Sequence, residues 1–242
     1  MQAIFRETLL AGADAWGLTL TGDALAQLEA YADRLMAANA VMNLTAITDH
    51  REVAQRHLLD AIHPEALSRL PQGARVIDVG TGAGLPGLPL AIVRPDLTVT
   101  LSDSLGKRIR FLQETVEALG LSGRVDTQWA RAEELGRRAG FREAYDVACA
   151  RAVAALPVLC EYLLPLVRVG GAALCWKGAA AGEEAEAASR AAARLGGGRP
   201  RATPYALPDL AGHWHLVEIA KRAPTPKAYP RKAGTPSKQP LS

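Results

Sequence analysis

The residues best suited to chemistry lie in a glycine-rich stretch at positions 76–87, which holds Gly80, Gly82 and Gly84. An apolar strand, a glycine turn and the start of a helix follow one another here, which is the order found in nucleotide-binding loops. Glycines let a ligand lie against the backbone because they carry no side chain. With Gly87, the spacing also satisfies the dinucleotide fingerprint, so the glycines alone leave the ligand open.

Asp78 favours a cationic ligand over a pyrophosphate. It stands at the end of the strand, where we expect its carboxylate to face whatever the loop holds. A pyrophosphate there would meet a like charge in a partly desolvated site, which is unfavourable. S-adenosylmethionine instead carries a sulfonium and an ammonium group, and a carboxylate stabilises both. The sequence therefore predicts S-adenosylmethionine as the ligand, with a nicotinamide dinucleotide as the alternative.

Further polar positions follow the next two strands. Asp103 ends the second strand and can accept hydrogen bonds from two ribose hydroxyls, or it can cap the helix that begins near Leu105. Ala132 and Glu133 follow the third strand, where they could bracket an adenine base. An isolated Glu at such a place is more often a solvated helix charge, so Asp78, Asp103 and the glycine loop together carry the prediction.

Basic side chains near the expected site are candidates for contact with an anionic group. Arg151 ends the fourth strand and can bind a carboxylate or a phosphate, or form a salt bridge in the core. Arg56 and His57 lie on a helix before the sheet, where Arg56 and Asp60 could form an i,i+4 pair that only supports the helix. Lys177 follows the fifth strand and can reach phosphate or remain exposed.

Alternating strands and helices connect these positions. Apolar runs at 75–79, 97–101, 124–128, 145–150 and 172–176 are predicted strands separated by helices, and two final strands are expected within 201–219. The helices between them include a charged one at 132–139 and a surface one at 183–195. Parallel strands with helices between them place their carboxyl ends at one edge of the sheet, where ligands bind. We therefore expect an α/β fold of Rossmann-like type with a mostly parallel, seven-stranded sheet.

A helical cap and a basic tail flank the predicted sheet domain at 71–222. Residues 1–70 have helical periodicity, with Thr21 and Asp49 as expected N-caps. Residues 223–242 form a Pro-rich tail that we expect to be extended or irregular. From Lys221 to the last residue there are six Lys or Arg and no Asp or Glu, which suits a polyanionic partner or simply a solvated tail.

The composition of the 242 residues is that of an ordinary globular protein, with a net charge of +3. The three cysteines form no CxxC pair, so we expect buried thiols in a reducing compartment and no metal site. No apolar run approaches the roughly 20 residues that span a bilayer, and the N-terminus lacks a signal-peptide pattern. These features predict a soluble, cytoplasmic protein, and we expect a monomer.

Five motifs carry a resemblance to a known family. They are Asp78-Val-Gly-Thr-Gly-Ala-Gly-Leu-Pro-Gly-Leu-Pro89, Asp103-Ser-Leu-Gly-Lys-Arg108, Asn43-Leu-Thr-Ala-Ile47, Arg56-His-Leu-Leu-Asp60 and Ala150-Arg-Ala152. Together they resemble the bacterial small ribosomal RNA methyltransferase G family, also called glucose-inhibited division protein B. The closing segment Tyr229-Pro-Arg-Lys-Ala-Gly-Thr-Pro236 is similar to the tail of the longer members. The similarity runs from about residue 23 to residue 241, and only Ala83, at a position that is often Pro, departs from the motifs.

The resemblance implies a class I S-adenosylmethionine-dependent methyltransferase. Its implied substrate is N7 of a guanine (nucleotide 527 in the family) in the decoding-region loop of 16S rRNA, in the small ribosomal subunit or an assembly intermediate. By similarity, the expected cofactor contacts are Gly80, Leu85, Asp103, Ser104, Leu105, Ala132, Glu133 and Arg151. The glycine loop adds Asp78, Gly82 and Gly84 to these contacts. Candidates for positioning the substrate are Asn43, Arg56, His57, Lys177 and Arg222.

The chemistry of N7 explains why no acid–base pair stands out in the sequence. Its in-plane lone pair is unprotonated at neutral pH, so an in-line displacement needs alignment and electrostatics but no general base. Because A-form RNA hides the major-groove edge, the guanine must be unpaired or flipped out. We expect the basic tail to add salt-sensitive RNA affinity, so that deleting residues 227–242 weakens RNA binding and spares cofactor binding.

Three alternatives remain open from the sequence. A nicotinamide-dependent oxidoreductase would use the same glycine loop. A methyltransferase for another RNA, for DNA, for protein or for a small molecule would share the fold, although residues 150–153 do not match the Asp/Asn-Pro-Pro-aromatic motif of amino-group methyltransferases. A non-enzymatic RNA-binding module would also fit the tail, although the intact loop argues against it.

Overall fold

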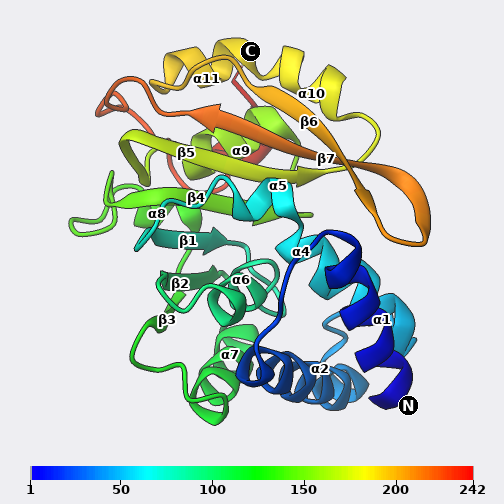
Figure 1. Cartoon of the computed structure of the whole chain (residues 1–242). Coiled ribbons are helices and arrows are strands. Elements are labelled where there is room, and N and C mark those ends of the chain that lie inside the picture. Colours follow the sequence, from blue (N-terminus) through cyan, green and yellow to red (C-terminus); the bar gives the residue numbers. More distant parts are fainter. Residues whose placement is uncertain (1, 242) are drawn as a thin grey trace.

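A seven-stranded sheet forms the centre of the molecule, with helices on both faces (Figure 1). The computed structural model describes residues 2–241. The strands are β1 (Arg75–Val79), β2 (Thr98–Asp103), β3 (Val125–Trp129), β4 (Tyr145–Arg151), β5 (Val167–Lys177), β6 (Arg201–Leu207) and β7 (Leu210–Ala220). Their order in the sheet is β3-β2-β1-β4-β5-β7-β6.

The first five strands are parallel, and β7 is antiparallel to both β5 and β6. The predicted mostly parallel, seven-stranded sheet is therefore confirmed. Strands β1 and β2 are buried along all but their first residue, because helices cover both faces of the sheet. The strand order reverses between β1 and β4, and this switch point is where sheets of this class bind ligands.

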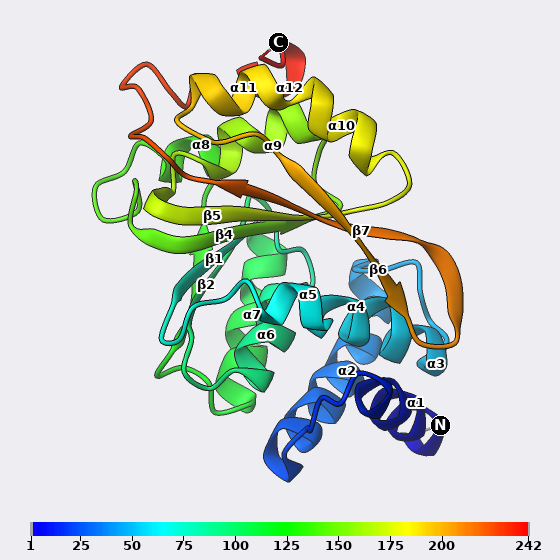
Figure 2. The ribbon, with the colours of Figure 1, turned by 45° about the horizontal axis from the view of Figure 1, so that its top comes forward.

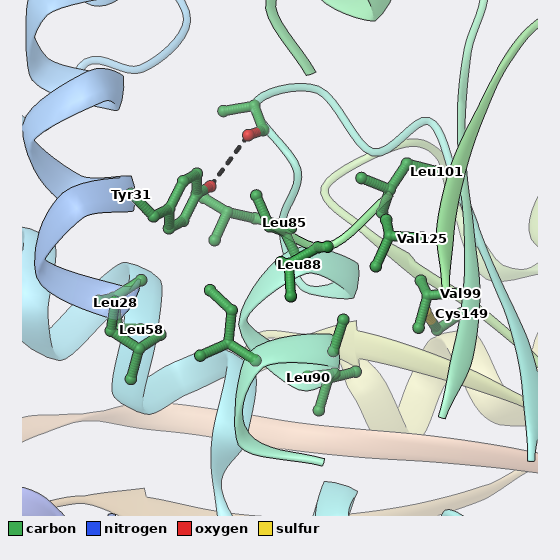
Figure 3. Close-up of a cluster of buried hydrophobic side chains, with 14 of the residues drawn as sticks. Leu28, Tyr31, Leu58, Leu85, Leu88, Leu90, Val99, Leu101, Val125 and Cys149 are labelled. Carbon is green, nitrogen blue, oxygen red and sulfur yellow. Dashed lines mark hydrogen bonds between the residues drawn. The ribbon is translucent and has the colours of Figure 1, made fainter. Parts of the chain in front are cut away.

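The N-terminal cap consists of α1 (Gln2–Ala15), α2 (Gly22–Met42), α3 (His50–Glu52), a π-helical segment (Val53–Leu59), α4 (Asp60–Ile62) and α5 (Pro64–Leu67). The two predicted caps are confirmed: the Thr21 side chain accepts from the Ala24 amide, and the Asp49 side chain accepts from the Glu52 amide. Figure 3 shows Leu28 and Leu58 of the cap near Leu88 of α6 (Gly87–Val93). Cap and sheet residues thus share one apolar core.

The remaining helices are α7 (Gly106–Ala118), α8 (Ala132–Leu135), α9 (Leu156–Leu163), α10 (Ala181–Ala187), α11 (Ser189–Arg194) and α12 (Thr235–Lys238). The helix expected over 132–139 ends early, at Leu135, and the one expected over 183–195 is two helices that meet at Ala188. The three cysteines are free and buried, as predicted. Among the described residues, no helix is long and apolar enough to cross a membrane.

The C-terminal segment is mostly irregular, as predicted, but it is packed against the body of the protein. Pro230, Pro236 and Leu241 are buried, and α12 contacts α9. Figure 2 shows this end of the chain beside the helices that cover one face of the sheet. The predicted cap and tail also include Met1 and Ser242, which lie outside the described residues.

Candidate cofactor site

The glycine loop after β1 is fixed from two sides. The amides of Gly80 and Thr81 donate to the Ser102 carbonyl of β2 at 2.8 and 3.0 Å. From the cap, the hydroxyl of the buried Tyr31 donates to the Ala83 carbonyl at 2.9 Å (Figure 3). Gly80, Gly82 and Gly84 adopt φ values of 69°, 60° and 107°. Only glycine takes these conformations without strain, so the turn requires them.

Asp78 does not face the space beside the loop, so that expectation was wrong. Its side chain is fully buried, and Oδ2 accepts hydrogen bonds from the Thr81 hydroxyl at 2.7 Å and the Gly87 amide at 2.8 Å. Burial raises the pKa of Asp78 to about 6, against the lowering effect of these two hydrogen bonds. The carboxylate therefore closes the loop onto the start of α6. Its physical role is to hold the turn's shape.

Asp103 binds the glycine loop and the residue before α7, but it is not the N-cap of that helix, which is Leu105. Its side chain is 3% exposed. Oδ1 accepts from the Leu105 amide at 2.8 Å, and Oδ2 accepts from the Gly82 amide at 3.0 Å and from Arg108 at 3.1 Å. A carboxylate offers about four lone-pair sites, so little capacity is left while Arg108 is bound. Arg108 is 32% exposed, so it is the partner of Asp103 that solvent reaches.

A hollow opens at the carboxyl ends of the parallel strands, and we call it the first hollow. Of the predicted cofactor residues, Gly80, Asp103, Ser104, Ala132 and Glu133 line it. The loop glycines Gly82 and Gly84 do not line it, Leu85 is buried in the core, and Leu105 is 44% exposed outside it. The structure thus gathers the ends of β1, β2 and β3 around one space.

Glu133 is not a solvated helix charge. It is 3% exposed, and its Oε1 accepts a hydrogen bond from the Gly234 amide of the C-terminal segment at 2.8 Å. Tyr162 of α9 and Ser237 of α12 also line the first hollow, and no pattern in the sequence selects either. One signal was available: Glu161 stands in the otherwise apolar helix α9, and a buried carboxylate requires a partner from elsewhere in the chain.

Arg151 does not line the first hollow. Its NH1 donates to Asp60 Oδ2 at 2.6 Å and to the Arg56 carbonyl at 3.1 Å. Asp60 Oδ1 also accepts from the Tyr205 hydroxyl at 2.6 Å. Arg151 is therefore in the internal salt bridge that was the alternative interpretation of this residue, and it ties the cap to the end of β4.

The expected Arg56–Asp60 pair is absent, because Arg56 pairs with Glu52 at 3.3 Å and Asp60 pairs with Arg151. The reason is the π-helical segment that contains Arg56. The Asp60 amide donates to the carbonyl of Gln55, five residues earlier. This wider turn rotates Asp60 away from the solvent-facing side on which Arg56 lies.

A second hollow adjoins the first. Asp60, Arg151, Trp176, Tyr205, His213 and Trp214 contribute to its lining. The two hollows share the segment after β4, since Val153 and Ala154 line the first, whereas Arg151 and Ala152 line the second. Ala152 has a φ of 56°, an uncommon conformation for a residue with a side chain, and such strain is concentrated at functional sites.

The glycine loop needs Gly80 partly because of this shared segment. A Cβ placed on Gly80 would lie 2.7 Å from Val153 Cγ2. Lys177 also lines the second hollow, but its Nζ donates to the Ala154 carbonyl at 2.8 Å and to Glu184 at 2.7 Å. Lys177 thus braces the shared segment and is already engaged.

The other substrate candidates lie apart from one another. Asn43 is exposed and ends α2 with a φ of 50°. His57 is buried, its Nε2 lies 2.8 Å from the Thr45 hydroxyl, and burial together with Arg151 lowers its pKa to about 4. Arg222 follows β7, whose last residue pairs with Ala172 of β5, and Ala172 in turn pairs with Val147 near the start of β4, so Arg222 lies toward the opposite edge of the sheet. The antiparallel direction of β7 explains this placement.

The first hollow fits S-adenosylmethionine in its chemistry. Two buried carboxylates, Asp103 and Glu133, face a space bounded by glycine backbone and small apolar side chains, and the Arg131 in its lining is exposed. Buried carboxylates stabilise a cation or accept from hydroxyl and amino groups. Within residues 2–241, no three His, Cys, Asp or Glu side chains gather as a metal site would need.

Comparison with known proteins agrees with this geometry. The family model of GidB, rRNA small subunit methyltransferase G, matches residues 24–203. The chain is 51% identical over 207 residues to ribosomal RNA small subunit methyltransferase G of Symbiobacterium thermophilum, with 84% of each chain covered. It is 43% identical over 225 residues to the protein of that name from Moorella thermoacetica, with 93% of each covered.

Solved structures agree on the fold. A SAM-dependent O-methyltransferase from Thermotoga maritima superimposes with a TM-score of 0.52 at 14% identity, over 79% of this chain and 72% of that one. Such a distant likeness supports the class I methyltransferase fold alone. The family follows from the sequence relatives and from the model that covers most of the sheet domain. This chain belongs to the rRNA small subunit methyltransferase G family.

Proposed function

We propose that this chain transfers a methyl group from S-adenosylmethionine to N7 of a guanine in 16S rRNA. The observation that carries the proposal is the pair of adjoining hollows at the carboxyl edge of the sheet, the first of which holds two buried carboxylates. The names of the relatives support the ribosomal RNA of the small subunit as substrate. We propose the cytoplasm as the place of action, and the small subunit or an assembly intermediate as the partner.

The first hollow would bind the cofactor. We assign Asp103 to the ribose hydroxyls, after release of Arg108, and Ala132 to one face of the adenine. Glu133 would accept a hydrogen bond from an N–H or O–H group of the adenosyl moiety. S-adenosylmethionine supplies a methyl group bound to a positively charged sulfur. The carboxylates raise the local affinity for that cation, and the shape of the loop leaves no side chain in its way.

The second hollow would receive the guanine. Its lining includes the rings of Tyr205, His213 and Trp214, against which a flipped-out base can stack. The chain needs only to hold the base, since the N7 lone pair attacks without loss of a proton. Fixed positioning of this kind can lower a barrier by roughly 7–11 kcal/mol in favourable cases. The segment 151–154 between the hollows sets their relative positions.

The oxidoreductase alternative loses its support, although on different grounds from those the sequence offered. Asp78 holds the loop and does not repel a phosphate. Asp103 suits the ribose hydroxyls of either cofactor, so it does not separate the two ligands. The family model and the relatives, which are methyltransferases by name, disfavour the oxidoreductase.

Methyl transfer with product mapping tests the proposal. The chain is incubated with S-adenosylmethionine labelled in its methyl group and with small-subunit particles or RNA that lack the modification. Chemical cleavage at N7-methylguanine then locates the product. We expect label at one guanine of the decoding-region loop. Label at another atom or in another RNA, or no transfer to either substrate, would refute the proposal.

A further inference from the structure

The C-terminal segment crosses one face of the protein and ends at the first hollow. It starts at the amino edge of the sheet, where the Lys221 amide donates to the Gly171 carbonyl at 2.8 Å. It ends at the carboxyl edge, where α12 lies against α9 and Ser237 lines the first hollow (Figure 2). The segment that follows the last strand therefore takes part in the site built by the first three.

Charged side chains anchor the beginning of this segment. Lys221 has no exposed side-chain surface, and its Nζ donates to the Leu164 carbonyl and the Thr225 hydroxyl and lies 3.2 Å from Glu143. Arg142 donates to the Thr225 and Tyr229 carbonyls at 2.7 and 2.8 Å. Arg142 thus fixes the backbone of the segment, whereas Lys221 and Thr225 contribute their own side chains to the anchor.

A second anchor stands just before the site. The guanidinium of Arg231 binds Glu161 of α9, with NH2 to Oε2 at 2.7 Å and Nε to Oε1 at 3.0 Å. The Glu161 carboxylate is 1% exposed, and the Arg231 amide also donates to it at 2.6 Å. A bidentate pair with a buried carboxylate fixes both position and direction.

The last contact of the segment is with Glu133, a side chain that lines the first hollow. Three residues after Arg231, the Gly234 amide donates to Glu133 Oε1 at 2.8 Å. Gly234 has a φ of 82°, a conformation that favours glycine, and it is the residue that precedes α12. Tyr162 belongs to the same group: burial and the Glu133 carboxylate raise its pKa, and a hydrogen bond with Ser237 opposes that rise.

We infer that the turn Gly234–Ser237 forms one wall of the cofactor hollow, and that Gly234 and Arg231 are positioning residues that hold Glu133 in its binding orientation. The inference rests on the proposed use of the first hollow for S-adenosylmethionine. It reverses the expectation that residues 227–242 can be removed without loss of cofactor binding. The basic side chains of the tail would then contribute to RNA binding, whereas the turn Gly234–Ser237 would contribute to cofactor binding.

Truncation before Gly234 tests the wall. Removal of residues 234–242 eliminates the amide donor to Glu133 and the Ser237 surface, and leaves the Arg231–Glu161 pair in place. Calorimetric titration with S-adenosylhomocysteine is expected to give a Kd at least about tenfold higher than that of the full chain. The matched control is Lys227→Gln with Lys232→Gln, which removes two exposed charges of the same tail and should leave Kd unchanged.

An exchange measurement on the unaltered chain guards against a truncated protein that fails to fold. Because Gly234 and the cofactor would both bind Glu133, saturation with S-adenosylhomocysteine should slow hydrogen exchange of the Gly234 amide by about tenfold or more. The Gly120 amide at the end of α7 is the internal reference. Equal exchange with and without the ligand, or an unchanged Kd after truncation, would overturn the inference. Failure of the full chain to bind would instead refute the proposed function.

Discussion

The N-terminal cap and the C-terminal segment support the same site by different physical means. The cap packs leucines such as Leu28 and Leu58 into the core it shares with the sheet, and it reaches the glycine loop through Tyr31. The C-terminal segment reaches Glu133 through hydrogen bonds and ion pairs to buried groups, among them Glu161. Apolar packing tolerates small shifts, whereas a bidentate ion pair fixes one geometry. The segment therefore fixes the geometry of the site more specifically, whereas the cap contributes more to the free energy of unfolding.

The largest expected effect is the loss of apolar packing in the cap. Leu58 is fully buried, so Leu58→Ala should lower the free energy of unfolding by about 3 kcal/mol, through lost burial and the cavity left behind. Denaturant titration measures the change. Val41, which is 84% exposed, supplies the control, and Val41→Ala should change it by less than about 0.5 kcal/mol. A similar, small change in both variants would show that the cap is not part of the shared core.

The next effect concerns the anchor of the C-terminal segment. Arg231→Met leaves the Glu161 carboxylate buried and without its cation, and we expect a loss of about 2 kcal/mol. The partial exposure of Arg231 keeps this below the loss for a fully buried pair. Arg199→Met is the matched control, since Arg199 and Glu186 are both more than two-thirds exposed and their pair should contribute little. Glu161→Leu, added to Arg231→Met, should recover part of the loss; no recovery would contradict the assigned cause.

Acid should affect the cap through its buried histidines. Burial lowers the pKa of His63 from 6.5 to about 3, so between these values the unfolded chain binds a proton that the folded chain does not. The free energy of unfolding should therefore fall as the pH drops from 6.5 toward 4. In His63→Asn, which keeps a side-chain acceptor for the Ala66 amide, that fall should be smaller by between about 1 and 2 kcal/mol. Parallel pH profiles for both proteins would show that His63 does not titrate in this way.

A smaller effect is expected where the cap touches the loop. Tyr31→Phe removes the hydroxyl that donates to the Ala83 carbonyl and should lower the free energy of unfolding by about 1 kcal/mol. It should also raise the Kd for S-adenosylhomocysteine by a few fold, because the loop loses one of its two fixed sides. Thermal melting and calorimetry give the two values. Unchanged cofactor affinity would limit the cap to a purely structural role.

The sequence allowed prediction of features that have local signals, but not of contacts between groups that only the fold brings together. The cap helices, the five parallel strands and the glycine loop were predicted because periodicity, capping residues and glycine spacing are local signals. The roles of Asp78 and Asp60 were predicted wrongly, because the hydrogen-bond partners of both carboxylates depend on which groups the fold brings beside them. Asp78 binds the loop that follows it, and the π-helical turn rotates Asp60 onto Arg151.

The C-terminal wall could not be predicted for a related reason. The contacts of the C-terminal segment join groups far apart in the sequence, such as Lys221 with Leu164 and Gly234 with Glu133, which are 57 and 101 residues apart, and several of them use backbone atoms that any residue supplies. Proline content correctly indicated an irregular path but says nothing of where that path leads. The buried Glu161 in an apolar helix was the one local sign that a cation had to come from elsewhere.

The most direct test of the account is the affinity of the first hollow for the cofactor. Calorimetry of the full chain should show one S-adenosylhomocysteine per chain. Asp103→Ala should weaken binding by about 30- to 100-fold, since two hydrogen bonds to a charged acceptor are lost. Asp126→Ala, at an exposed position of β3, should bind as the unaltered chain does. Equal affinity of the Asp103 and Asp126 variants, or tight binding of a nicotinamide dinucleotide in place of S-adenosylhomocysteine, would contradict it.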